Sequence, residues 1–300
     1  MNEHTYPARP IRLVLGFSPG SASDLIARAL LPDLERQLGQ PVAVELHQGE
    51  GGAIGAEIVA RSAPDGYTLF MATLGTHALA PHRSRSLPYD PVRDFAPVSL
   101  VAHMPLVLAC HPSVEAESVG QLIALFRARR RRLTYASSAV GGAPHLAAEL
   151  FQSMAQVEMA HVVYDNTDKL YADFVAGRVA LSFNNVLSMA SRIHAGTLRG
   201  LAVTASKRSA VLPKLPTMAE AGLVGYEVTN WLGVVAPAGT PPEIVAVLHR
   251  GIVAALRTQA VRKRLGAVGV EPWSSTPDEF TAHIDRELAR WAPVVARFRT

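Results

Sequence analysis

Apolar and polar positions alternate along the first third of the chain in a pattern that predicts strands, each followed by a helix. Runs of β-branched and long apolar residues stand at 11–17, 41–46 and 65–74, and each gives way to residues with helical spacing. The segment 24–38, which follows the first run, carries leucines and alanines on one helical face. Strands that alternate with helices predict a parallel sheet with helices on its faces.

Two long extended segments, at 99–112 and near 223–236, interrupt this alternation. Between them the strand–helix pattern restarts and continues through several more helices. Two sheet domains joined by two extended crossings are what a hinged, two-lobed α/β architecture requires. We therefore expect lobe one to comprise 1–102 plus 229–300 and lobe two to comprise 103–228, with a ligand cleft between them.

Two helix starts are marked in the last quarter of the chain. The sequences TPPE at 240–243 and TPDE at 276–279 each place Thr at the cap, Pro in the first turn and Glu at the third helical position. This arrangement predicts a capping box, in which the Thr and Glu side chains satisfy backbone N–H groups at the helix start.

The composition is that of a globular protein. The 300 residues are 49% hydrophobic and 18% charged, and no apolar run approaches the roughly 20 residues of a membrane-spanning helix, so we expect no direct membrane insertion. A net charge of +4 allows an anionic ligand without demonstrating one. Cys110 is the sole cysteine, which excludes an intrachain disulfide and a cysteine zinc cluster. We expect it to be a buried, inert thiol.

Each predicted lobe contains one turn of small residues between a strand and a helix. In lobe one it is 17-FSPGSASD-24, and in lobe two it is 135-YASSAVGGAPHL-146. Such turns expose backbone N–H groups and hydroxyls at a helix N-terminus, where an anion binds best. Ligands of open α/β sheets lie beyond the carboxyl ends of the strands, so two such turns facing a cleft would suit a carboxylate or a phosphate. The alternative, that each turn only caps its helix, stays open.

Polar residues at other strand ends are further candidates for this cleft. Asp24 either starts its helix favourably, fixes the turn or accepts a hydrogen bond from the ligand. The remaining candidates follow strands, where turn formation or strand capping would explain them equally well. They are Thr76, Tyr164, Asp165, Asn166, Asn184 and Asn185.

Other patterns are explained without a ligand. The run 127-RARRRR-132 has no interleaved aromatic residues, so we interpret it as the solvated end of a helix and expect no nucleic-acid binding. His77 and His82 are separated by a proline and do not share a helical face, so we expect no metal site. GxxxxGK[ST] is absent and GEGGAIG lacks the spacing of a dinucleotide fingerprint, so we expect no cofactor.

Taken in order, these segments resemble one family of proteins. The motifs are YPARPIRLVLGFSPGSASDLIARAL, LGQPVAVE, PDGYTLFMAT, YDPVRDFAPVSLVA, YASSAVGGAPHLAAELF, LRGLAVTASKRSAVLPKLPTMAEAG and WLGVVAPAGTPPEIV. They resemble the Bug/TctC proteins, the periplasmic substrate-binding components of tripartite tricarboxylate transporters. The resemblance covers nearly the whole chain. It implies a two-lobed α/β fold like that of periplasmic binding proteins, each lobe a mainly parallel sheet flanked by helices, which closes over a small ligand, commonly a carboxylate.

The resemblance also implies which residues hold the ligand. In this family the first turn and the Ser/Gly turn of lobe two grip a carboxylate, largely through backbone N–H groups and hydroxyls. The matching positions are Phe17, Ser18, Gly20, Ser21, Ser23 and Asp24 in lobe one and Ser137, Ser138, Gly141, Gly142 and His145 in lobe two.

The chain departs from the family pattern at several of these positions. Ser21 replaces a glycine, Ala139 stands where glycine is usual, and Gly142 stands where a hydroxyl residue is usual. Asp165 stands where a lysine is common. Because an acid beside an anion site repels the anion, we expect a ligand that keeps a carboxylate but differs at its far end from a simple dicarboxylate.

Together the observations favour a receptor with no catalysis of its own. We expect a monomeric periplasmic solute-binding protein that captures a small organic acid for membrane transporter subunits, with its export signal already removed. A sensor working with a signalling partner and a two-lobed enzyme acting on an anionic metabolite stay open as alternatives. Against the enzyme, Ser138 and His145 stand seven residues apart across a helix start, so they are not convincingly paired as nucleophile and base.

Overall fold

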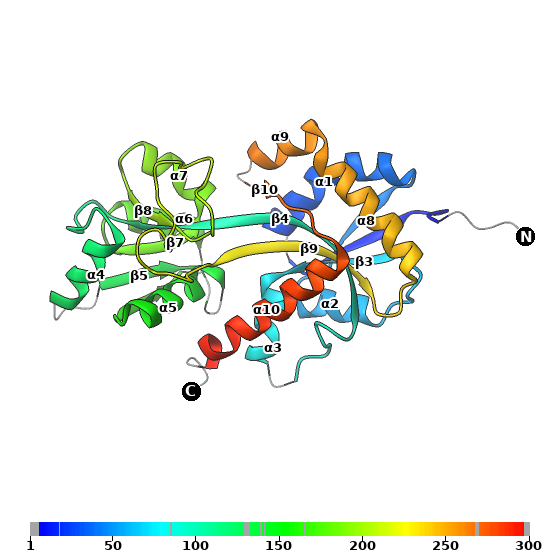
Figure 1. The fold of residues 1–300 in the computed structure, drawn as a ribbon, viewed down its shortest axis with the longest axis horizontal. Helices are drawn as coiled ribbons and strands as arrows, with labels where there is room; N and C mark the ends of the chain where they lie inside the picture. The colour runs from blue at the N-terminus through cyan, green and yellow to red at the C-terminus, as the bar shows by residue number, and fades with distance from the viewer. Residues whose placement is uncertain are drawn as a thin grey trace, which may run out of the picture. The chain divides into compact units, whose positions relative to one another are not determined.

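The computed structural model divides the chain into two compact units (Figure 1). Unit 1 comprises Met1–His103 and Trp231–Thr300, and unit 2 comprises Met104–Asn230. The chain therefore passes between the units at 103/104 and 230/231, against the expected 102/103 and 228/229. The residues that the structure describes are 6–17, 19–84, 86–128, 133–138, 140, 142–164, 166–267 and 270–296.

Unit 1 is built on a sheet whose first three strands are parallel. β1 (Ile11–Leu15) lies between β2 (Val42–Leu46) and β3 (Thr68–Thr73). β3 pairs on its other side with β9 (Thr229–Pro237), which runs antiparallel to it. β3 is buried along its whole length and β1 at every position except Arg12, so the middle of this sheet forms the core of the unit.

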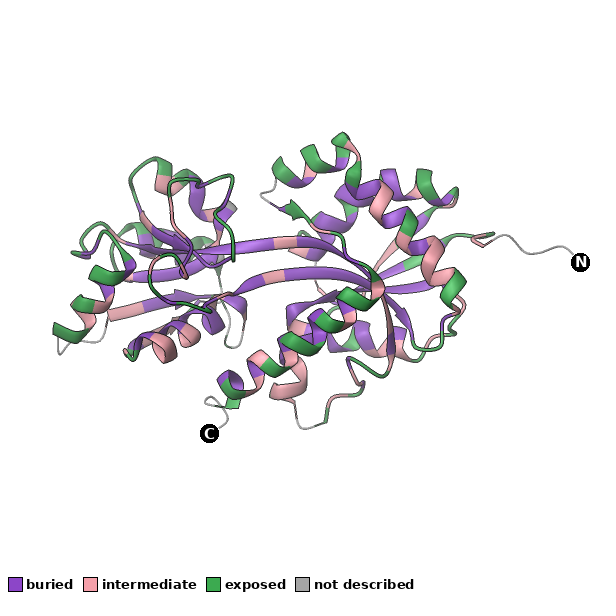
Figure 2. Cartoon of the chain, viewed as in Figure 1, coloured by how far each residue is buried: buried purple, intermediate pink, exposed green. Residues whose placement is uncertain are grey.

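Helices cover both faces of the unit 1 sheet. The helical elements are α1 (Ala22–Leu38), η1 (Glu50–Gly52), α2 (Ala53–Ala60), η2 (Gly75–Leu79), α3 (Ala80–Arg83), α8 (Pro242–Arg257), α9 (Gln259–Ala267) and α10 (Pro277–Ala296). α1 packs against α8 and α9, whereas α10 packs against η2 and α3. Figure 1 shows these two groups on opposite sides of the strands, and Figure 2 shows that their exposed residues lie away from the sheet.

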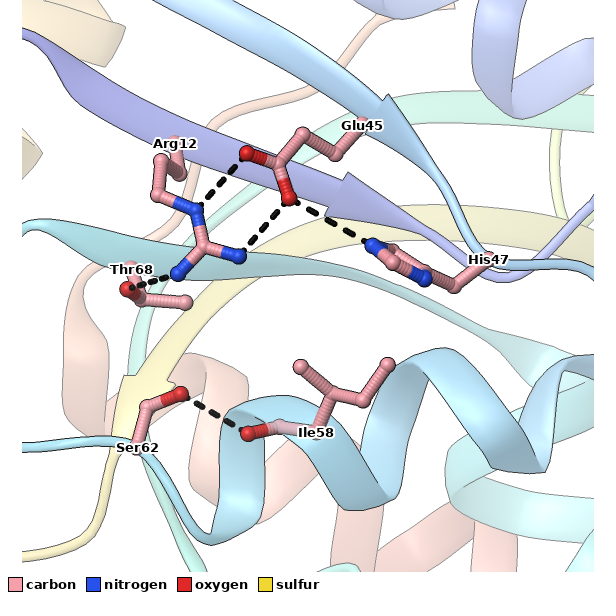
Figure 3. A network of polar contacts seen from close by, with 6 residues as sticks. All are labelled: Arg12, Glu45, His47, Ile58, Ser62 and Thr68. Carbon is pink, nitrogen blue, oxygen red and sulfur yellow. Dashed lines mark hydrogen bonds and ion pairs between the residues drawn. The ribbon is translucent and has the colours of Figure 1, made fainter.

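A polar network joins the three parallel strands of unit 1 on one side of the sheet (Figure 3). Arg12 on β1 donates through Nε and Nη2 to the two carboxylate oxygens of Glu45 on β2, both at 2.7 Å. Its Nη1 lies 3.4 Å from Thr68 Oγ1 on β3, and His47 Nε2 lies 3.4 Å from Glu45 Oε2. The hydrogen bonds from Arg12 lower the pKa of Glu45 to about 2. Because both partners are partly exposed, we expect the pair to add no more than about 1 kcal/mol of stability.

Unit 2 contains a second sheet with a parallel centre. β5 (Leu133–Ser137) lies between β6 (Met159–Val163) and β7 (Leu181–Asn185) and is parallel to both. β7 and β8 (Arg199–Val203) each pair antiparallel with β4 (Phe95–Cys110).

The helices of unit 2 lie on both sides of this sheet. They are α4 (Val119–Ala128), α5 (Ala143–Ala155), α6 (Thr167–Val175) and α7 (Val186–His194). Ala136 of β5 belongs to an apolar cluster with Phe174 of α6 and Met189 of α7. The preceding residue, Tyr135, donates its hydroxyl hydrogen to Glu149 of α5 at 2.7 Å. Because successive residues of a strand point to opposite faces, α5 covers one face of β5 and α6 and α7 cover the other.

The two predicted capping boxes have different outcomes. The one at 276–279 is confirmed by reciprocal side-chain-to-backbone bonds of 3.1 and 2.8 Å between its Thr and its Glu. The one at 240–243 is wrong, because α8 has Pro241 as its cap and no side-chain cap bond forms there. The Thr240 hydroxyl donates instead to the carbonyl oxygen of Pro237 at 2.7 Å, so it closes the preceding turn.

Two continuous strands carry the chain from one unit to the other. β4 begins at Phe95, earlier than the expected position 99, and passes the boundary after His103. β9 enters unit 1 at Trp231. Pro105 lies in β4, two residues after His103. Proline has no N–H to donate to a neighbouring strand, so within sheets it occurs at edges and irregular positions.

Two expectations from composition can be compared with the structure. The prediction that Cys110 is buried is confirmed, and burial raises the pKa of its thiol to about 11, which disfavours the reactive thiolate. Among the described residues, no single helix has the length and apolar character to cross a membrane; α8 and α9, bent by 71° at their junction, meet that test only as a pair.

Candidate ligand-binding site

Glycines bring the carboxyl ends of β1, β2 and β3 together. A Cβ at Gly16 would lie 2.6 Å from Gly52 Cα, and a Cβ at Gly55 would lie 3.1 Å from Gly16 Cα. Only glycine lets the turn after β1 approach the start of α2 so closely. A Cβ at Gly52, where φ is +96°, would lie 2.7 Å from Thr76 Cγ2 and 3.1 Å from the ring of Phe17. Phe17 and Thr76, both predicted site residues, thus meet around Gly52.

Thr76 is fully buried, and its polar groups bond within unit 1. Its Oγ1 accepts from Thr73 N–H at 3.0 Å and lies 3.0 Å from His77 Nδ1. Its carbonyl oxygen accepts from Tyr89 OH at 2.7 Å. Thr76 therefore supports the end of β3, and it turns its methyl group toward Gly52.

Asp24 fixes the turn that precedes α1. Ser21 is the N-cap, and its hydroxyl accepts from Asp24 N–H at 3.4 Å. The buried Asp24 carboxylate accepts from Gly20 N–H at 2.9 Å and from Arg28 Nε at 2.7 Å. Ser23 is also buried, with its hydroxyl oxygen 3.1 Å from that of Ser21. Of the roles left open by the sequence, fixing the turn is the one that these bonds support.

The matching turn of unit 2 leads from β5 into α5. Ser137 is fully buried at the end of β5, whereas Ser138 is exposed. Gly142, the N-cap of α5, has extended backbone and no side chain with which to cap the helix. Pro144 and the buried His145 follow in the first helical turn. The predicted site residues Ser18, Gly141 and Asp165, the family departure at Ala139, and most of the arginine run lie outside the described residues.

Three nearly parallel rings lie beside the start of α5. The His161 ring of β6 lies 4.6 Å from the Tyr135 ring and 4.3 Å from the His145 ring, with interplanar angles of 3° and 9°. His161 Nε2 lies 2.7 Å from Ser137 Oγ. On α5, Glu149 Oε1 accepts from Tyr135 OH and lies 3.7 Å from His145 Nε2. The predicted residue His145 is thus part of a cluster that includes Ser137.

His161 is not among the residues predicted from the sequence. Its signal is the register of β5 and β6, which sets it opposite Tyr135, and that register is not visible in a single sequence. A serine in contact with a histidine also resembles a paired nucleophile and base. Ser137 is fully buried, so its hydroxyl is not exposed to solvent.

The other predicted residues of unit 2 form bonds within the unit. Tyr164 N–H donates to the carbonyl oxygen of Ser137 at 2.9 Å, and its hydroxyl donates to Asp173 Oδ2 at 3.1 Å. Asn184 is buried, and its Oδ1 accepts from the N–H of Asn185 at 2.9 Å. Tyr164 therefore ties the end of β6 to the end of β5.

In each unit, helices begin beyond the carboxyl ends of the parallel strands; among them, α1 follows β1 in unit 1 and α5 follows β5 in unit 2. We call the α1 turn, residues 17–24, turn 1 and the α5 turn, residues 137–145, turn 2. The N–H groups of the first helical residues have no partner within the helix, and the helix dipole adds partial positive charge there. Among the described residues, no group of three or more His, Cys, Asp or Glu side chains could hold a metal ion. The geometry suits a small anion bound through backbone donors.

Comparison with known proteins places the chain in a family. The family model TctC, the tripartite tricarboxylate transporter family receptor, matches residues 26–299. The chain belongs to this family. The resemblance drawn from the sequence motifs is therefore confirmed.

Relatives of this TctC family member match it over almost its full length. Protein BugT of Bordetella pertussis is 39% identical over 97% of this chain and 90% of its own length. The solved structure of Rhodopseudomonas palustris Rpa4515 with adipate is 38% identical, with a TM-score of 0.81 and 97% of each chain covered. MatC (Rpa3494) from the same species, solved with bound malate, is 30% identical, with a TM-score of 0.77 over 97% of this chain and 100% of its own. These structural relatives confirm the predicted two-lobed α/β fold class.

Proposed function

We propose that this TctC family member is a periplasmic solute-binding protein that captures a small carboxylate-bearing ligand for transport, with the backbone N–H groups of turn 1 and of turn 2 as donors. The observation that carries the proposal is the presence of two helix N-termini, those of α1 and α5, at the carboxyl ends of parallel strands in different units. A carboxylate accepts several N–H bonds at once, and bonds to a charged acceptor are about twice as strong as neutral ones.

The ligands of two relatives support a carboxylate as the ligand class. Rpa4515 was solved with adipate and MatC with malate, and both compounds are dicarboxylates. The family is named as a tripartite tricarboxylate transporter family receptor. We therefore expect capture and release of an unchanged ligand, with membrane transporter subunits as the partners of the loaded form.

A thermal-shift screen of ligand-stripped protein tests the proposal. The panel contains mono-, di- and tricarboxylates, aromatic acids and amino acids. Acids with an amine at the far end are included because Asp165 stands where a lysine is common in the family. A ligand at about 100 times its dissociation constant stabilises the protein by roughly 2.7 kcal/mol, which raises the Tm by several degrees. No Tm shift with any carboxylate of the panel would count against the proposal.

Proline substitutions at the first helical residue test the two turns separately. Ala22→Pro and Ala143→Pro each remove one N–H while keeping a helical φ. The residues before them, Ser21 (φ −65°, ψ 164°) and Gly142 (φ −78°, ψ 165°), already have the extended backbone that proline requires of its predecessor. Loss of one hydrogen bond to a charged ligand should weaken binding roughly tenfold or more.

Gln259→Pro is the matched control. It removes an exposed first-turn N–H of α9, whose cap Thr258 has φ −66° and ψ 144°. The control should keep both the fold and the affinity measured by calorimetry. Equal affinity in the control and in both turn variants would show that these N–H groups do not hold the ligand.

A further inference from the structure

His161 contacts polar and aromatic groups of β5 and α5. Its ring stacks on the rings of Tyr135 and His145, with centroids at 4.6 and 4.3 Å, and the centroids of those two rings are 6.3 Å apart. Among the described residues, Tyr135 of β5 and His145 of α5 are the titratable groups that stack on it, and Glu149 of α5 contacts both of these. Burial lowers the pKa of His161 below its ordinary value, which favours the neutral ring.

The hydrogen bond between Ser137 and His161 can run in either direction. At 2.7 Å, an unprotonated Nε2 accepts the hydroxyl hydrogen of Ser137. When Nε2 carries a hydrogen, it donates to Ser137 Oγ, and the serine hydrogen turns elsewhere. Ser137 ends β5 and begins turn 2. Whether His161 Nε2 carries a hydrogen therefore determines whether the Ser137 hydroxyl hydrogen points to His161 or toward that turn.

Turn 2 and His161 are separated by a single ring. His145 lies in the first turn of α5, where its own N–H lacks a partner within the helix, and its side chain stacks on His161. An anion held by the first turn of α5 would therefore lie within electrostatic reach of His161. Negative charge at this distance favours the protonated imidazole.

We propose that His161 is a positioning residue that couples anion binding at turn 2 to the uptake of a proton. The inference rests on the proposed function and adds a pH dependence to it. Binding raises the pKa of His161 because the anion stabilises the imidazolium. The ligand is therefore held more tightly as the pH falls from 8 to 6, a range in which ordinary carboxylates keep their charge.

Calorimetry tests the coupling, with adipate as the probe or, if adipate gives no Tm shift in the screen, with the acid that gives the largest shift in its place. Titrations between about pH 6 and 8, in buffers with different ionisation enthalpies, give the dissociation constant and the number of protons taken up. One linked proton changes the constant by at most about tenfold per pH unit. We expect wild-type protein to bind roughly three- to tenfold more tightly at pH 6 than at pH 8, with net proton uptake.

His161→Gln keeps a hydrogen-bonding amide but has no titratable group, so it should bind adipate with one affinity across this range and with no proton uptake. His111→Gln is the matched control, because His111 Nδ1 lies 2.8 Å from Ser113 Oγ but follows β4 at the edge where β7 begins, opposite turn 2. The control should keep the wild-type pH dependence. Should the glutamine variant fail to fold, the imidazole of His161 can be titrated by NMR in wild-type protein, where its pKa must rise when adipate binds.

Particular results would overturn the inference while leaving the proposed function intact. One is adipate binding without proton uptake in wild-type protein. Another is unchanged uptake in His161→Gln, or its loss in His145→Gln alone, which would assign the proton to His145. If neither adipate nor any other carboxylate of the screen binds at either pH, the proposed function and this inference fall together.

Discussion

Two buried histidines of unit 1 predict a loss of stability in mild acid. His77 is fully buried among the rings of Phe70, Tyr89 and Phe95, and His283 is buried against tryptophan rings. Nε2 of each has no hydrogen-bond partner among the described residues. Burial lowers the pKa of each to about 3.

The size of the effect follows from proton linkage. An unfolded histidine has a pKa near 6.5, so below that pH the unfolded chain binds protons that the folded state does not bind. The free energy of unfolding therefore falls until the pH reaches the folded-state pKa near 3. Between pH 7 and pH 5 this amounts to about 2 kcal/mol for each histidine and about 4 kcal/mol for both. For a domain of about 150–250 residues, the Tm of unit 1 should fall by roughly 8–16 °C.

The interval from pH 7 to pH 5 separates the histidines from the carboxylates. The pKa of Glu45, for example, is lowered to about 2, so its contribution is lost only as the pH falls below its unfolded value near 4.5. The double variant His77→Phe, His283→Phe should lose most of the pH dependence in this interval. His194→Gln, at an exposed position on α7, should keep it. Scanning calorimetry at both pH values decides: an equal Tm drop in wild type and double variant would refute the reasoning.

Two further substitutions test other contacts. Gly16→Ala places a Cβ 2.6 Å from the backbone of Gly52, and this overpacking should cost about 1–3 kcal/mol in thermal unfolding and abolish the ligand-induced Tm shift; an unchanged shift would show that turn 1 tolerates displacement. Asp33→Ala removes the buried partner of Arg36 and Arg264, so it should cost about 3 kcal/mol in urea unfolding. A cost below about 0.5 kcal/mol would mean that water replaces these bonds, as at an exposed ion pair.

The order of elements could be predicted from the sequence because it depends on local patterns. Strand and helix periodicity is carried by neighbouring residues, and so is the capping box at 276–279. The box at 240–243 failed although its residues match, because Thr240 is buried and finds a carbonyl in the preceding turn. A local motif therefore predicts a cap only where the tertiary structure leaves its side chain free.

The candidate site could be predicted only in part for the same reason. The small residues of turns 1 and 2 are visible in the sequence, but their partners are not. Gly16 and Gly52 meet because two strands lie side by side, and Ser137 contacts His161 across 24 positions of sequence. The sequence does show an acid next to the turn, yet only the structure shows that Asp24 bonds to Gly20 and Arg28.

The discontinuity of unit 1 has a consequence for biosynthesis. Unit 2 is one uninterrupted stretch, whereas unit 1 is assembled from both ends of the chain. Unit 2 up to Val228 is therefore synthesised before β9 and α8, while β3 still lacks its antiparallel neighbour and α1 its helix partner. Domains generally fold as units, so the inner unit can complete its fold first. The segment translated earliest must wait, with its apolar faces uncovered, for the segment translated last.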